Sequence, residues 1–172
     1  MRRFLLPFLV FFAFICESTF AHLVQFPFAT EDHLFVPRFV LIVVIFITVY
    51  LNRTQGMLFG FFFGLLHDIV YIEVVGIYLF PYAMIAYLIS KAMKVIHGHV
   101  LIVLLLIVLA ISVLEFYVYG VNLATGVTSM KAYDFTMYRL LPTLALNTLV
   151  AMLFVFPFRG FLTKLKQAEL ED

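Results

Sequence analysis

The stretch that decides the fold spans residues 56–68 and reads GMLFGFFFGLLHD. Glycine recurs at Gly56, Gly60 and Gly64, and Asp68 continues the same interval. Four residues advance an α-helix by about 400°, so each member of the series lags the one before it by about 40°. The series therefore forms a stripe on one face, and phenylalanine and leucine cover the other sides. The stretch predicts a helix in lipid with a small-residue face, against which a second backbone can pack closely.

The composition of the whole chain agrees with a membrane setting. Of its 172 residues, 65% are hydrophobic, 12% are charged and 22 are phenylalanine. Soluble domains are about 45–50% apolar and about 25% charged. We therefore expect an all-α integral membrane protein. The net charge of +1 says little, because the distribution of charge matters more than its sum.

Several classes of function find no support in the sequence. No nucleic-acid patch, phosphate-cradling loop or nucleophile–base arrangement is visible. The single cysteine, Cys16, has no partner for an intrachain disulfide. His97 and His99 alone are weak ligands for a structural zinc ion. We expect neither an enzyme nor a protein with a cofactor or metal.

Apolar segments that suit bilayer crossing recur along the chain. About 20 residues at about 1.5 Å each span a hydrocarbon core of about 30 Å. The predicted spans are about 4–24, 34–51, 55–72, 76–93, 99–119 and 138–160, in one polytopic domain over residues 1–172. The second and third are short and leave a re-entrant hairpin as an alternative, but that hairpin would bury Arg53 at a high cost. A bundle of six transmembrane helices is the favoured fold.

Basic residues set the expected orientation, because cytoplasmic loops carry an excess of lysine and arginine. With the N-terminus inside, six spans return the C-terminus to the cytoplasm. The cytoplasmic set is then Arg2, Arg3, Arg53, Lys91, Lys94, Arg159, Lys164 and Lys166, and the external set is Arg38, Lys131 and Arg139. The sequence thus predicts a multi-pass protein of the cell membrane with both termini in the cytoplasm.

The glycine face and Asp68 have two interpretations each. Gly56, Gly60 and Gly64 either pack against another helix of this chain or form a groove for a helix of a partner protein. Asp68 lies in the outer half of the membrane, where a carboxylate is costly unless it is paired or hydrated. It is either a buried polar clamp or part of a site for a ligand or partner.

Other polar residues fall within the predicted spans. Glu17, Glu115 and Arg139 form a candidate outer polar cluster, with His22 and His67 at similar depth; exposure at the headgroup level is the alternative for Glu115, His22 and Arg139. Asn147 lies near mid-membrane, where we expect it to be buried and hydrogen-bonded across helices. Pro81 and Pro142 are candidate helix kinks, since proline removes a backbone donor.

These residues resemble the family of the bacterial rod shape-determining protein MreD. The resemblance rests on Gly60, on Gly64-Leu65-Leu66-His67-Asp68, and on Gly76 followed by Pro81-Tyr82, together with chain length and span number. It implies a non-enzymatic scaffold of the peptidoglycan elongation machinery in the cell membrane. It further implies direct contact with MreC and association with the polymerase RodA, a class B penicillin-binding protein and, indirectly, the MreB filament.

An alternative is a small-molecule or lipid-binding subunit of a transporter. The expected architecture is similar to the substrate-capture subunits of energy-coupling-factor transporters, which are six-span bundles with an outward-facing pocket. In that case Asp68, Glu17 and Glu115 would lie near the ligand. Such subunits carry an Ala-x-x-x-Ala docking signature in the first span, whereas this chain has only Ala13 and Ala21 there.

Overall fold

The computed structural model describes residues 5–25, 34–72, 75–96 and 99–171. Outside the described part lie Arg2, Arg3, His97, residues 26–33 between the first two predicted spans, and the side chain of His22. The described part contains helices and no strand, so the all-α prediction is confirmed. Its elements are α1 (Leu5–Gln25), α2 (Phe39–Tyr50), α3 (Arg53–Tyr71), α4 (Leu79–Val95), α5 (Val100–Ala124), α6 (Ala132–Phe135), the π-helical turn η2 (Thr136–Leu140) and α7 (Leu141–Glu171).

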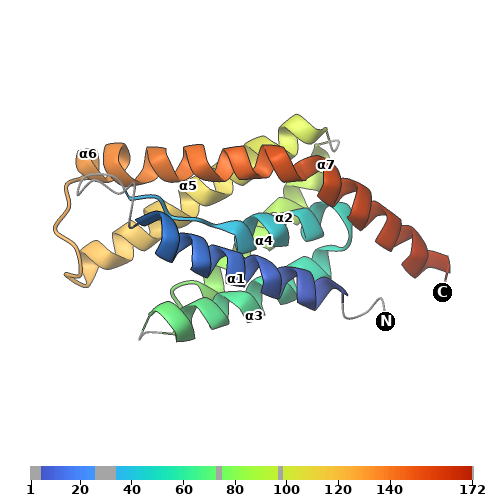
Figure 1. Ribbon diagram of the computed structural model, residues 1–172, viewed down its shortest axis with the longest axis horizontal. Coiled ribbons are helices and arrows are strands. Elements are labelled where there is room, and N and C mark those ends of the chain that lie inside the picture. The colour runs from blue at the N-terminus through green and yellow to red at the C-terminus, as the bar shows by residue number, and fades with distance from the viewer. Residues whose placement is uncertain (1–4, 26–33, 73–74, 97–98, 172) are drawn as a thin grey trace.

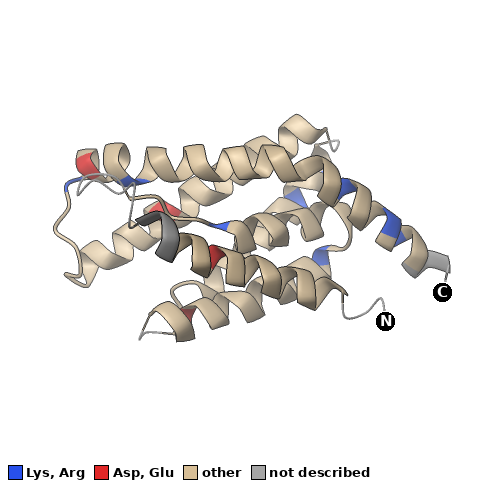
Figure 2. Cartoon of the chain, in the orientation of Figure 1, with Lys and Arg blue, Asp and Glu red and all other residues tan. Residues whose placement is uncertain are grey.

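The long helices run along one axis in alternating directions (Figure 1). Helices α1, α3 and α5 run one way, and α2, α4 and α7 run the other. The start of α1 and the end of α7 lie at the same end of the molecule (Figure 1). Lysine and arginine gather toward that end, whereas the described aspartate and glutamate lie in the rest of the bundle (Figure 2).

Helix α2 is the centre of the bundle and contacts α1, α3, α4, α5 and α7. Its sequence, FVLIVVIFITVY, is apolar on every side, which is typical of a fully enclosed helix. Ten of its 12 residues are buried. A helix of this length rises only about 18 Å and is too short to cross a hydrocarbon core of about 30 Å alone.

Residues 34–38 precede α2 as an extended segment, so the predicted helix 34–51 is wrong at its start. Pro37 explains the break, because proline cannot donate to a helical hydrogen bond and disfavours helical geometry at Val36. Non-helical backbone at membrane depth is tolerated only where protein satisfies its polar groups. The partners of this segment are therefore part of the site described below.

Other boundaries also differ from the prediction, and α7 continues to Glu171 instead of ending near residue 160. Helix α5 continues to Ala124 and helix resumes at Ala132, so the predicted loop 120–137 is shorter. Pro81 lies in the first turn of α4, where helical N–H groups need no partner within the helix, so the helix begins near this proline. Pro142 is the second residue of α7, just after the π-helical turn of residues 136–140, and the proline inside α7 is Pro157.

The surface of the bundle is apolar. Large side chains are exposed on several helices, among them Phe8, Phe62 and Leu101. Two helical stretches, Val100–Ala124 and Ala132–Ala168, are long and apolar enough to cross a membrane, and Leu5–Ala21 and Phe39–Tyr50 are shorter apolar helices. An exposed apolar surface of this extent suits contact with lipid rather than water.

Candidate functional site

The glycine face forms a seam inside this chain, which we call the glycine seam. A Cβ atom at Gly60 would lie 3.0 Å from the carbonyl oxygen of Tyr82, and one at Gly64 would lie 2.7 Å from that of Tyr78. A Cβ atom at Gly56 would lie 2.9 Å from the Cα atom of Thr48 in α2. Helices α2 and α4 therefore fill the groove. The alternative of an open groove for a partner helix is wrong for Gly56, Gly60 and Gly64.

Asp68 continues this seam and caps α4. Its side chain is fully buried, and its two carboxylate oxygens accept N–H groups of Gly76 at 2.7 Å, Tyr78 at 2.7 Å and Leu79 at 3.1 Å. The positive end of the α4 dipole compensates the negative charge. Gly76 has φ of 117°, a conformation that favours glycine and lets the turn reach the carboxylate. Asp68 thus lies as a buried clamp between α3 and α4.

Glu17 joins three helices. Its Oε2 atom accepts the N–H of Val40 in the first turn of α2 at 2.9 Å, and its Oε1 atom lies 2.9 Å from Nε2 of His67. The Nδ1 atom of His67 lies 2.8 Å from the carbonyl oxygen of Phe63, which can only accept, so Nδ1 carries a hydrogen. The hydrogen bond between Nε2 of His67 and Oε1 of Glu17 then needs a second hydrogen, which is carried by one of these two atoms. This pair ties α1 and α3 to the start of α2.

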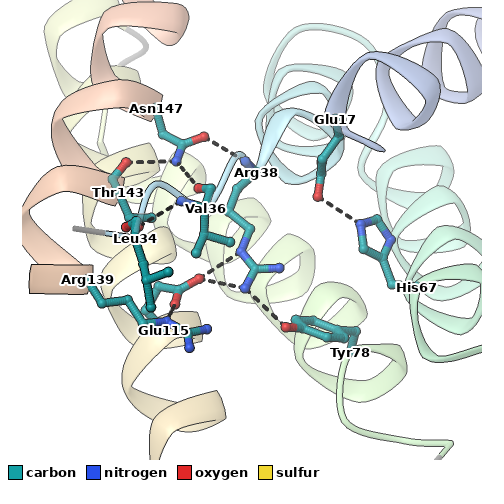
Figure 3. Close-up of polar contacts among 10 residues, drawn as sticks. All are labelled: Glu17, Leu34, Val36, Arg38, His67, Tyr78, Glu115, Arg139, Thr143 and Asn147. Carbon is teal, nitrogen blue, oxygen red and sulfur yellow. Dashed lines mark hydrogen bonds and ion pairs between the residues drawn. The ribbon is translucent and has the colours of Figure 1, made fainter. Parts of the chain in front are cut away.

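Arg38 is the centre of a second group, which we call the arginine layer: Arg38, Tyr78, Glu115 and Arg139. Arg38 is 4% exposed and Glu115 is fully buried. The Nε atom of Arg38 donates to Oε1 of Glu115 at 2.7 Å, and Nη2 lies 2.6 Å from the same oxygen. Nη2 also donates to the Tyr78 hydroxyl at 3.1 Å. Arg139 donates from Nε to Oε2 of Glu115 at 3.3 Å (Figure 3).

Two sequence interpretations are corrected here. The sequence places Arg38 in the external basic set, but its side chain lies inside the bundle. The alternative that Glu115 is exposed at the headgroup level is also wrong. Both acidic residues of the candidate cluster are buried, but Glu17 pairs with His67 apart from the group around Glu115 (Figure 3).

The extended segment 34–38 is bonded to α7 by a ladder of side chains. Asn147 accepts the N–H of Arg38 at 2.7 Å and donates to the carbonyl of Val36 at 2.8 Å. Thr143, one turn earlier, accepts the N–H of Val36 at 3.2 Å and donates to the carbonyl of Leu34 at 3.5 Å (Figure 3). These bonds give hydrogen-bond partners to backbone N–H and C=O groups that would be bonded within the segment if it were helical.

Pro142 completes this ladder. A proline has no N–H, so Pro142 cannot bond to the carbonyl of Tyr138 one turn earlier. That carbonyl accepts the N–H of Leu34 at 2.8 Å instead. The proline therefore provides an acceptor for the first residue of the extended segment.

The chemistry of these groups is that of a closed structural network. Every carboxylate oxygen of Glu17, Asp68 and Glu115 is bonded to protein. Within the described residues no group of three or more His, Cys, Asp or Glu could hold a metal ion. Sequence reasoning missed Arg38, Tyr78 and Thr143. Two of these residues had a local signal in the sequence. Arg38 follows Pro37 directly before the most apolar helix, and Thr143 lies four positions before Asn147.

Comparison with known proteins gives a consistent result. The family model described as rod shape-determining protein MreD matches residues 2–165. The chain is 43% identical over 172 residues to "Rod shape-determining protein MreD" of Bacillus subtilis (strain 168), covering 100% of this chain and 99% of the relative. No solved structure matches.

Proposed function

The chain belongs to the family of the rod shape-determining protein MreD, and from that premise we propose that it is a non-enzymatic scaffold that links MreC to the machinery of cell-wall elongation. The match over the whole length of a curated relative carries this proposal. The geometry supports it, because the buried charged groups Arg38, Asp68 and Glu115 are all bonded by other groups of the protein. A network of this kind fixes helix positions and presents a defined apolar outer surface.

The proposed arrangement in the membrane is six crossings with both termini in the cytoplasm. The alternating helix directions and the basic end at the start of α1 support it (Figures 1 and 2). The burial of Arg38 removes one residue from the external basic set and strengthens the charge asymmetry.

Cysteine labelling in intact cells tests this topology. In a Cys16→Ser background, Thr128→Cys in the turn after α5 should react with a membrane-impermeant maleimide. Asn52→Cys, between α2 and α3, should react only after permeabilisation. Equal labelling of both positions in intact cells would contradict six crossings.

Contact with MreC is proposed to occur through the exposed apolar faces of the helices and the short loops. The glycine seam is filled from within, so it offers no groove to a partner helix. Association with RodA and a class B penicillin-binding protein is proposed as well, and contact with MreB is proposed to be indirect. Co-purification of tagged chain with MreC, with and without those proteins present, separates direct from indirect contact.

Complementation tests the shape function. Depletion of the MreD relative in Bacillus subtilis should give rounded cells, and expression of this chain should restore rods. The Arg38→Met variant should fail, whereas Gly120→Ala, at a position with nothing within 4 Å of the added Cβ, should succeed. Persistent rounding despite wild-type levels of folded chain in the membrane would overturn the proposal.

The transporter-subunit alternative loses its main support. It requires carboxylates that are free to meet a ligand, whereas Glu17, Asp68 and Glu115 are all engaged by protein groups. Native mass spectrometry of the purified chain gives a direct check, since a stoichiometric vitamin-like ligand would revive that alternative.

A further inference from the structure

A groove of about 530 Å³ lies on the surface of the bundle between α1 and α7. Both helices pack on α2, whose side chains form the bottom of the groove. Phe8 and Phe12 line the wall on α1. Phe154 and Phe158 line the wall on α7. No charged side chain is among the described residues that line it, so the groove suits an apolar occupant.

The length of the groove matches one leaflet of a bilayer. It extends from Leu5 to Cys16 along α1 and from Phe161 to Val150 along α7. Each stretch is about 11 residues long and spans about 16 Å at about 1.5 Å per residue. The hydrocarbon core is about 30 Å thick, so the groove covers about half of it. A transmembrane helix crosses the full thickness, whereas the acyl chain of a phospholipid ends near mid-membrane.

The size of the lining side chains also favours an acyl chain over a helix. Interfaces between membrane helices are enriched in small residues, which let two backbones approach closely. Ala13 and Cys16 are the small residues of this lining, and both lie on α1. Phenylalanine, leucine, isoleucine and valine make up the rest. Walls of this kind keep a second backbone at a distance but enclose a thin hydrocarbon chain.

The mouth of the groove lies at the basic end of the molecule. Leu5 and Phe161 line this end, near the start of α1 (Figure 1), and lysine and arginine gather toward the same end (Figure 2). Lys164 follows Phe161 by three positions, so the two side chains are neighbours on one face of α7. Lys164 is exposed, and among the described residues no carboxylate forms an ion pair with it. A negatively charged headgroup at the mouth complements this charge.

We propose that the groove binds one phospholipid of the leaflet that meets the basic end of the molecule. One acyl chain lies along the groove and ends between Cys16 and Val150, and the anionic headgroup lies beside Lys164. The lipid contacts α1, α2 and α7 together, so it stabilises the position of α1 relative to α7. This site requires only that the chain lies in a membrane and does not depend on the proposed scaffold role.

Native mass spectrometry of the full chain in a neutral detergent tests the groove. With phosphatidylglycerol added, the wild type should retain one lipid per chain. Val150→Phe places a ring in the deep end and should lower the retained fraction about tenfold, a factor that corresponds to about two displaced methylene groups. Leu149→Phe is the matched control, since Leu149 is 59% exposed on the same helix and does not line the groove. It should retain the lipid within about twofold of the wild type.

Cys16→Leu tests the deep end from the opposite wall and should lower the retained fraction as Val150→Phe does. Equal retention by Val150→Phe and Leu149→Phe would overturn the proposal. Unchanged lipid retention in Val150→Phe, with loss of a co-purifying single-span protein or of a dimer instead, would assign the groove to a helix and also contradict it. Folding of each variant is checked by its thermal transition without lipid.

Cross-linking of the wild type gives a result that does not depend on the folding of any variant. A photoreactive group at the end of the acyl chain should label the segments around Cys16 and Val150. The same group next to the headgroup should label those around Leu5 and Phe161. Labels spread over all lipid-facing helices would show that the lipid belongs to the general annulus, and the groove would lose its role.

Exchange of the headgroup tests the charge at the mouth. Phosphatidylcholine should be retained about fivefold less than phosphatidylglycerol, because a lysine near the surface contributes about that factor toward an anionic lipid. Lys164→Gln should bring the two lipids within about twofold of each other. Equal retention of both lipids by the wild type would rule out an anionic headgroup as the occupant of the mouth.

Discussion

Asp68 and Glu115 are both fully buried carboxylates, yet the protein holds them in different ways. Asp68 is bonded by three backbone N–H groups that lie 8, 10 and 11 positions along the chain. Glu115 is bonded by the side chains of Arg38, 77 positions away, and Arg139, 24 positions away. The first carboxylate fixes the turn between two neighbouring helices. The second connects helices that are distant in the sequence, so its loss should disturb the whole bundle.

The largest effect is expected from Arg38→Met. The change leaves the buried Glu115 with only Arg139 and removes the donor to Tyr78. Removal of one partner of a buried ion pair typically costs about 3–5 kcal/mol, because the remaining charge stays desolvated. Reversible unfolding in mixed micelles measures the loss.

A double variant sharpens this result. Arg38→Met combined with Glu115→Leu removes both buried charges and leaves Arg139, whose side chain is 24% exposed and can reach the headgroup region. The double variant should therefore be more stable than the sum of the two single losses indicates. Strict additivity would show that the two residues do not act as a pair.

Asp68→Asn should give the next largest effect and a local one. The amide keeps a single acceptor oxygen and introduces an NH₂ group beside backbone donors. We expect a loss of about 2–3 kcal/mol from unsatisfied buried N–H groups. Hydrogen exchange should rise at Tyr78 and Leu79 and stay unchanged at Val36 and Arg38. Arg38→Met should show the reverse pattern, and identical patterns in both variants would remove the distinction between the two regions.

Gly64→Ala tests the glycine seam itself. An added Cβ atom would meet the Tyr78 carbonyl oxygen at 2.7 Å and the Leu79 Cα atom at 2.9 Å, both backbone atoms that cannot swing aside. Overpacking of this kind costs about 1–3 kcal/mol, and we expect about 2 kcal/mol here. Gly120→Ala is the control, since nothing lies within 4 Å and alanine favours a helix interior. Equal stability of the two variants would mean that the seam opens without cost.

The same two regions show what sequence alone can predict. The glycine seam follows from one short stretch, because a spacing of four residues fixes which side chains share a helix face. Asp68 belongs to that stretch, and its capped helix begins only 11 positions later. The arginine layer joins residues up to 77 positions apart. Which distant helix meets Arg38 depends on the packing of the whole bundle, and helical periodicity carries no information about that choice.

The extended segment lies between these extremes. Pro37 was a local signal for the break before α2, but the apolar run that follows favoured a continuous span from residue 34. Asn147 was assigned to helix–helix bonding from its depth alone, and its partner proved to be the backbone of residues 36–38. A polar side chain in a span thus indicates that some group needs a partner, but not whether that group is a side chain or a broken backbone.

The smallest effect is expected from Thr143→Val, which keeps the shape of the side chain and removes its hydroxyl. The N–H of Val36 loses its hydrogen-bond acceptor, and the carbonyl of Leu34 loses the hydroxyl that donates to it. Hydrogen bonds between membrane helices contribute about 0.6 kcal/mol on average, so we expect a loss of about that size with raised exchange at Val36 alone. Thr163→Val is the matched control on the same helix, because the Thr163 hydroxyl is exposed and bonds to the carbonyl of Arg159 in its own helix. A loss of stability as large as that of Asp68→Asn would contradict this prediction, because the ladder would then stabilise the fold as much as the buried carboxylates do.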